Sequence, residues 1–153
     1  MSKKIAVILA GSGVYDGSEI YESVITLLAL DQQDAQVQCF APNIPQMHVV
    51  NHLTGEVAEG ETRQVLVEAA RLARGQIKDI AEAKAENFDA LIVPGGFGVA
   101  KNLSDFAIKG VEMSVNPQVL SLARSFKSAA KPVGLICISP TLAAAIFGEG
   151  VQC

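Results

Sequence analysis

Short apolar runs of strand length alternate with helical stretches along the whole sequence. The apolar runs are nearly continuous, which is typical of parallel strands buried on both faces of a sheet. This alternation predicts a single α/β domain over residues 1–153, with a mostly parallel sheet covered by helices on both faces. The segment 46–56 is compatible with a short strand or a loop. The strand-like runs are 3–10, 35–40, 88–96 and 132–137, and the helical stretches are 17–30, 61–75, 116–130 and the residues after Pro140.

Composition narrows the function classes. Half of the 153 residues are hydrophobic, enough for one proper core. The net charge is -4 and the basic residues are scattered, so no nucleic-acid partner is expected. Three cysteines without CxxC spacing and only two histidines give no basis for a disulfide framework or a metal site. The absence of a long apolar run or a signal peptide predicts a soluble, cytoplasmic protein without membrane attachment.

The first strand leads into a glycine-rich segment that invites comparison with dinucleotide-binding loops. Gly11, Gly13 and Gly17 give a GxGxxxG spacing, one residue longer than the dinucleotide fingerprint. The second strand ends in CFAP, without the acidic residue that would hold a ribose. We therefore interpret these glycines as a turn and expect no nucleotide cofactor.

Cys137 lies where the last strand passes into the final helix. Ser139 and Pro140 suit the N-cap and N1 positions of that helix, so the thiol precedes a helix N-terminus, which favours the thiolate. The same place suits a nucleophile elbow, in which the next N–H faces a developing oxyanion. An inert cysteine buried in the core is the competing interpretation. Cys39, within a strand, and Cys153, at the chain end, are both expected to be inert.

A carboxylate and a glycine pair could complete a site with Cys137. The helix over 17–30, with Ser18 as candidate N-cap, is apolar on almost every side and is expected to be largely buried. Glu22 in that helix must then reach the rim, pair with a cation or be protonated. Gly95 and Gly96 end a buried strand and expose backbone N–H groups, although a plain turn would use the same pair.

Together, the blocks VILAGSGVYDGSEIYE, NHLTGE, DALIVPGGFGVAKNLSDFA and GLICISP resemble the ThiJ/PfpI superfamily. Within it they are similar to the ElbB group of isoprenoid-biosynthesis glyoxalases, which are linked to enhanced lycopene production. The resemblance implies a flavodoxin-like three-layer sandwich of the class I glutamine amidotransferase type, usually a homodimer with a cofactor-free cysteine site. By this resemblance Cys137 is the elbow cysteine and Glu22 the glutamate that hydrogen-bonds its sulfur. The same resemblance implies that the backbone of Gly96 and of Ile138 supplies the oxyanion donors.

The resemblance has two departures. Ile138 follows the cysteine where many relatives have histidine, so peptidase activity is not expected. The chain also resembles only the N-terminal two-thirds of the group, so a C-terminal part of the domain is expected to be absent.

Three functions follow from these features. The first is a cofactor-independent glyoxalase that converts glyoxal or methylglyoxal to glycolate or lactate through a hemithioacetal on Cys137. The alternative is a redox-sensing or partner-binding protein with an oxidisable cysteine. A glutamine amidotransferase-like hydrolase ranks last, because neither His48 nor His52 stands where that superfamily places its histidine. His52 would lie in a surface turn or at the mouth of a pocket.

Overall fold

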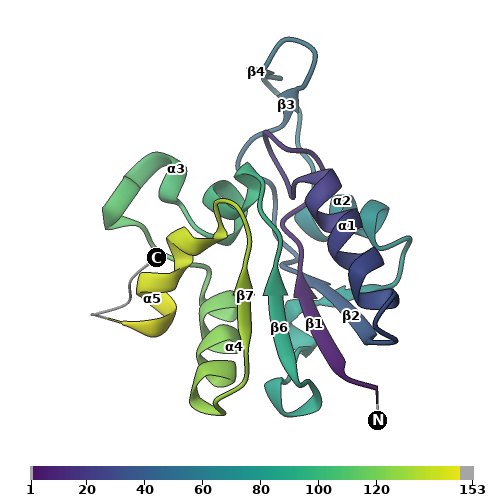
Figure 1. The fold of residues 1–153 in the computed structure, drawn as a ribbon. Helices are drawn as coiled ribbons and strands as arrows, with labels where there is room; N and C mark the ends of the chain where they lie inside the picture. Colours follow the sequence, from purple (N-terminus) through teal and green to yellow (C-terminus); the bar gives the residue numbers. More distant parts are fainter. Residues whose placement is uncertain (1, 149–153) are drawn as a thin grey trace.

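A five-stranded parallel sheet organises the chain in a computed structural model that describes residues 2–148. The strand order is β5-β2-β1-β6-β7, and every neighbouring pair is parallel. A separate antiparallel hairpin, β3–β4, projects beyond one end of the sheet (Figure 1). The strands are β1 Lys4–Ile8, β2 Gln36–Ala41, β3 Val50–Asn51, β4 Glu56–Val57, β5 Ile77–Asp79, β6 Ala90–Val93 and β7 Val133–Leu135.

Helices cover both faces of the sheet, so the predicted three-layer, flavodoxin-like arrangement is confirmed (Figure 1). Successive side chains of β1 point to opposite faces, as strand geometry requires. Ala6 and Ile8 pack in the core that α4 covers, whereas Ile5 and Val7 pack in the core that α2 covers. The α-helices are α1 Ile20–Asp31, α2 Val65–Leu72, α3 Phe106–Lys109, α4 Pro117–Ser128 and α5 Ala143–Phe147, and a π-helical turn covers Val99–Leu103.

Several local predictions are confirmed. Asn116 caps α4, because its side-chain oxygen accepts hydrogen bonds from the N–H groups of Gln118 and Val119, and Pro117 opens the helix. The 46–56 segment, which the sequence left open, contains β3, the turn after it and the first residue of β4. No helix among residues 2–148 is long and apolar enough to cross a membrane.

The helix α1 differs from its prediction in two respects. It is not largely buried: Tyr21 is 76% exposed and Ile25 63%, and Ser23 is its one fully buried residue. Its N-cap is Glu19, whose Oε2 accepts a hydrogen bond from Glu22 N–H at 2.6 Å. Ser18 turns inward instead, where its hydroxyl accepts the N–H of Ala10 at 2.7 Å, a bond that ties the end of β1 to the start of α1.

The functional end of the sheet is set by its topology. Without the short edge strand β5, the order β2-β1-β6-β7 has a switch point between β1 and β6, where the connections leave in opposite directions. Ligands of open α/β sheets bind at the carboxyl ends of strands beside such a point. The loop after β1 meets the turn after β6 there, through hydrogen bonds from Gly98 N–H to Gly17 O at 2.9 Å and from Phe97 N–H to Val14 O at 2.8 Å.

Candidate active site

Cys137 has a backbone conformation that distinguishes it from an ordinary strand residue. Its φ is +59°, in the left-handed region that costs a non-glycine residue about 1–3 kcal/mol. The other non-glycine residues with positive φ among those described, Asp34, Arg74 and Ala130, follow the C-terminal ends of helices, where this conformation is a common cap. Cys137 instead follows β7, and its side chain is exposed. The strand-to-helix turn therefore has the strained form of a nucleophile elbow.

Neighbouring residues hold this turn in place. Ile136 N–H donates to Val93 O at 3.1 Å, and the buried Ser139 hydroxyl donates to Pro94 O at 3.0 Å. Both hydrogen bonds join the turn to the end of β6, so they hold Cys137 in its strained backbone conformation. Ser139 was the predicted N-cap, but the helical turn begins one residue earlier, with Ile138 in the N-cap position.

Glu22 reaches the same place from α1. Its Oε2 accepts a hydrogen bond from Gly95 N–H at 2.8 Å, across 73 residues of sequence. A methyl group on Gly95 would overlap Cys137 Cβ and would lie 2.6 Å from Glu22 Oε2. Cys137 and Glu22 therefore flank the same side of Gly95, which only a residue without a side chain can occupy.

The two glycines after β6 have different roles from each other. Gly95 N–H is committed to Glu22, so Gly95 is a partner of the carboxylate and not the oxyanion donor that the sequence suggested. Gly96 has a φ of +96°, and its N–H has no acceptor among residues 2–148. The N–H of Ile138 also lacks one in that part of the chain. These two donors directly follow Gly95 and Cys137 in the chain, and neither is used by another described residue.

A pocket of about 480 Å³ opens beside this arrangement. Two of its lining residues adjoin the N–H donors. Ile138 carries one donor itself, and Phe97 follows Gly96 in the chain, so the pocket borders the elbow. The remaining walls come from the loop after β1, the hairpin β3–β4, the π-helical turn and α3, and include Tyr15, Val57, Phe106 and Ala107. His52 stacks on the Tyr15 ring, with ring centroids 4.7 Å apart, and does not itself line the pocket.

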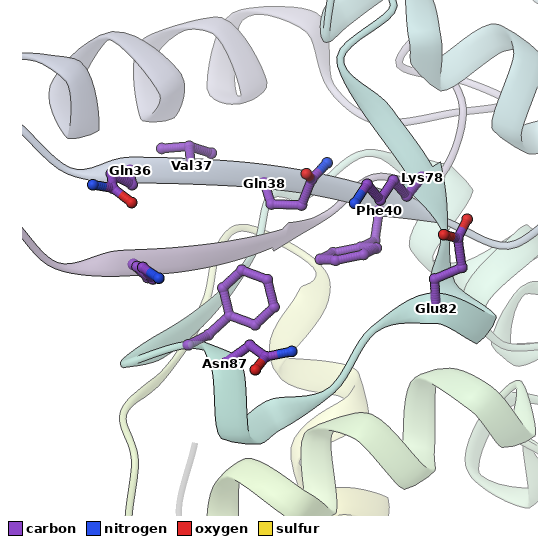
Figure 2. A pocket seen from close by; sticks show the side chains of 9 residues that line it. Gln36, Val37, Gln38, Phe40, Lys78, Glu82 and Asn87 are labelled. Carbon is purple, nitrogen blue, oxygen red and sulfur yellow. The ribbon is translucent and has the colours of Figure 1, made fainter.

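A second pocket lies away from this site. It has about 320 Å³ and lies along β2, where Gln36, Gln38 and Phe40 face it (Figure 2). Its other lining residues include Lys78 on β5, and Glu82 and Asn87 on the connection from β5 to β6. None of its lining residues belongs to the candidate site.

The two described cysteines are expected to react very differently. Burial raises the pKa of the Cys39 thiol to about 11, so at pH 8 only about one Cys39 in a thousand is ionised, and its side chain is also inaccessible. Iodoacetamide at pH 8 should therefore alkylate Cys137 at least about 100-fold faster than Cys39, as measured by peptide mass mapping. In denaturant the two rates should converge; equal rates in the native protein would contradict the burial of Cys39. Cys153 lies outside the described residues.

Known proteins resemble this chain in sequence, and solved structures resemble it in fold. The chain is 52% identical to human "Glutamine amidotransferase-like class 1 domain-containing protein 3, mitochondrial" over 97% of its own length and 55% of the relative. A crystal structure from Ehrlichia chaffeensis, called an isoprenoid biosynthesis protein with an amidotransferase-like domain, is 43% identical with a TM-score of 0.91. The match covers 99% of this chain and 68% of that one. The chain therefore spans about half the length of the curated relatives it matches.

A more distant structure shares only the fold. Glyoxalase III from Candida albicans is 10% identical, with a TM-score of 0.53, over 96% of this chain and 60% of that one. At this identity the likeness concerns the arrangement of strands and helices and not the activity.

These relatives correct one prediction. The human protein is named mitochondrial, as are rat and zebrafish relatives called ES1 proteins. Their names contradict the cytoplasmic location predicted from the sequence, which relied on the lack of a signal peptide for secretion. That criterion does not separate the cytoplasm from other compartments inside the cell.

The family itself is shown by a match over nearly the whole chain. The model of the DJ-1/PfpI family, another name for the ThiJ/PfpI family, matches residues 3–147. This range includes the elbow at Cys137, the glycine pair after β6 and the helix that carries Glu22. The chain belongs to the DJ-1/PfpI family.

Proposed function

We propose that this chain carries a glyoxalase site that needs neither glutathione nor a metal ion. The observation that carries the proposal is the convergence of the strained, exposed Cys137 and the Glu22 carboxylate on Gly95. A nucleophile beside a carboxylate suits a reaction that needs both covalent attachment and proton transfer. The substrate class is a small 2-oxoaldehyde such as methylglyoxal or glyoxal.

The first step forms a bond between Cys137 Sγ and the aldehyde carbon. The electron pair of the C=O bond moves onto the oxygen and gives a hemithioacetal oxyanion, which takes up a proton. Gly96 N–H and Ile138 N–H supply hydrogen bonds to that oxygen, because both lack an acceptor within the described chain. Covalent attachment also fixes the substrate beside Glu22.

The second step moves a proton between adjacent carbons. Glu22 takes the hydrogen of the former aldehyde carbon as a proton, and the electron pair passes through an enediol to the neighbouring ketone. Return of a proton to that second carbon gives a 2-hydroxy thioester. Water then cleaves the C–S bond, which releases lactate or glycolate and regenerates the thiolate, with no external oxidant or reductant.

The direct test is lactate formation from methylglyoxal without glutathione, with the reaction repeated in D₂O. Because Glu22 is half-buried and exchanges protons with solvent, most of the lactate should carry deuterium at C2. A hydride shift would leave C2 free of solvent deuterium. A folded protein that forms no lactate above the buffer rate would overturn the proposal.

The exposed thiol also favours the second candidate, a peroxide-sensitive switch at Cys137. In that case oxidation to the sulfinic acid would be the functional event, and the protein would act through a partner. Turnover of methylglyoxal that survives peroxide treatment would count against this role.

A glutamine amidotransferase activity has less support, because both ring nitrogens of His52 are engaged, one with Tyr15 N–H and one with Val50 O.

We also propose that the chain belongs to the isoprenoid-biosynthesis group within the family. The four sequence blocks that resemble this group span the chain, and the Ehrlichia chaffeensis structure of that name matches it at 43% identity. The link concerns group membership and assigns no terpenoid substrate to the site.

A homodimer is the assembly we propose, formed through the apolar outer face of α1. Tyr21, Val24, Ile25 and Leu28 are each between 48% and 76% exposed on one helix, a concentration that soluble monomers seldom leave open. This face belongs to the helix that carries Glu22, so the partner would border the site.

Replacing Ile25 with glutamate should weaken the dimer at least about tenfold, because it places a charge in a desolvated contact. Light scattering after gel filtration measures the change. Val111→Glu is the matched control, since Val111 is 93% exposed elsewhere and its replacement should leave the mass unchanged. A wild-type protein that is monomeric at high micromolar concentration would contradict the assembly.

A further inference from the structure

The pocket beside the elbow is much larger than methylglyoxal needs. Its volume of about 480 Å³ lies within the range of roughly 300–1,000 Å³ typical of small-molecule sites. Methylglyoxal would place only a methyl group there once its aldehyde carbon is bound to Cys137. A site that served such a small substituent alone would leave most of this space to water.

The side chains that line the pocket are mostly apolar. Aromatic and aliphatic side chains line it, including Tyr15, Phe97, Phe106 and Val57. Phe97 is 46% exposed and Tyr15 40%, so their rings present open apolar area to a ligand. Such walls recognise an apolar group and offer few hydrogen bonds to a polar one.

Lys101 is the single charged residue among the described lining residues, and its ammonium group is already engaged. Nζ donates to Tyr15 O at 2.7 Å and lies 5.8 Å from the centroid of the Phe97 ring. Burial lowers the pKa of Lys101, and the nearby Asp16 carboxylate opposes that effect. The ammonium group of this lysine thus links the Tyr15 loop to the Phe97 wall.

We infer that the pocket holds the substituent of the substrate, and that the site is adapted to 2-oxoaldehydes with a bulky apolar group, such as an aryl group. This inference rests on the proposed function. It deepens that proposal, because Ile138 both carries one of the proposed oxyanion donors and lines the pocket, so the substituent of a bound substrate has this pocket beside it. Each additional buried methylene typically contributes a several-fold preference.

The test compares phenylglyoxal with methylglyoxal in wild type and in two tryptophan variants. Ala107 lines the pocket and is exposed, so Ala107→Trp should narrow the pocket without disturbing the core. We expect it to lower kcat/KM for phenylglyoxal at least about tenfold and to leave methylglyoxal within about twofold. Ile108→Trp is the matched control, because Ile108 is the next residue, is 68% exposed and does not line the pocket.

A binding measurement separates this inference from the proposed function. Mandelate, the product from phenylglyoxal, and lactate are titrated by NMR against wild type and Ala107→Trp. Suppose that the protein turns over methylglyoxal, but Ala107→Trp changes the ratio of kcat/KM for phenylglyoxal to that for methylglyoxal by less than twofold. This result overturns the inference about the pocket and leaves the proposed glyoxalase activity intact. No turnover of either aldehyde, with mandelate binding that Ala107→Trp weakens, supports the pocket and overturns the glyoxalase. No turnover and no mandelate binding overturns both.

Discussion

Replacing Cys137 with alanine is expected to abolish lactate formation, with a loss in kcat/KM of about 10³-fold or more. The variant removes the sulfur that bonds to the aldehyde carbon in the proposed mechanism, so neither the hemithioacetal nor the thioester can form at this position. Removal of a covalent nucleophile in enzymes causes losses of this size, because the covalent intermediate on which the remaining catalytic groups act no longer forms. Steady-state rates with methylglyoxal, measured by enzymatic detection of lactate, give the comparison.

The fold should tolerate this substitution. Cys137 is exposed, and alanine adopts the same φ of +59° at similar cost, so the melting temperature should change by only a few degrees. Cys39→Ala is the control for loss of a thiol: it trims a buried side chain and lowers stability, but leaves the elbow intact. Full activity in Cys137→Ala would rule out covalent catalysis at this position.

The fold was predictable to a large extent because the strand signals are local. The four apolar runs correspond to β1, β2, β6 and β7, each within a few residues, and a continuous apolar run reports a buried strand regardless of its partners. The edge strand β5 was missed, since Ile77–Asp79 is short and lacks an apolar run. Its pairing with Cys39–Ala41 depends on the sheet and leaves no mark on its own composition.

The environment of α1 could not be predicted for a different reason. Ile20, Val24, Ile25 and Leu28 give a helix that is apolar on nearly all sides, and burial within the same chain is the usual explanation. The sequence pattern shows that the helix has a wide apolar surface, but it does not show whether other parts of the chain cover that surface. In this structure Leu27 and Leu30 pack against the sheet, while Ile25 and Leu28 face outward.

The site was predictable only residue by residue. A cysteine before a Ser-Pro pair and a glycine pair after a strand can each be read from local sequence. The bond between Gly95 N–H and Glu22 joins residues 73 apart, so no spacing rule exposes it. The pocket has the same difficulty, because its walls come from segments far apart in the sequence, and one of them is the hairpin β3–β4, which the sequence did not define.

The second large effect is expected from Glu22→Gln, which should lower kcat for methylglyoxal by about 10²–10⁴-fold. Glutamine has nearly the same shape, and its side-chain oxygen can still accept the hydrogen bond from Gly95 N–H. The variant therefore keeps the geometry around Cys137 and loses the ability to take a proton from the hemithioacetal. Rapid-quench kinetics followed by mass spectrometry should show the protein adduct with methylglyoxal accumulating on Cys137.

A comparison of Glu22→Gln with Glu22→Ala distinguishes proton transfer by Glu22 from a merely structural role. If Glu22 only held Gly95 in position, Glu22→Gln would retain turnover, whereas Glu22→Ala, which removes the acceptor of the Gly95 hydrogen bond, would not. If Glu22 moves the proton, both variants lose turnover, and iodoacetamide should still alkylate Cys137 in Glu22→Gln at close to the wild-type rate. Near-normal turnover in Glu22→Gln would remove Glu22 from the chemistry and require another base near the hemithioacetal.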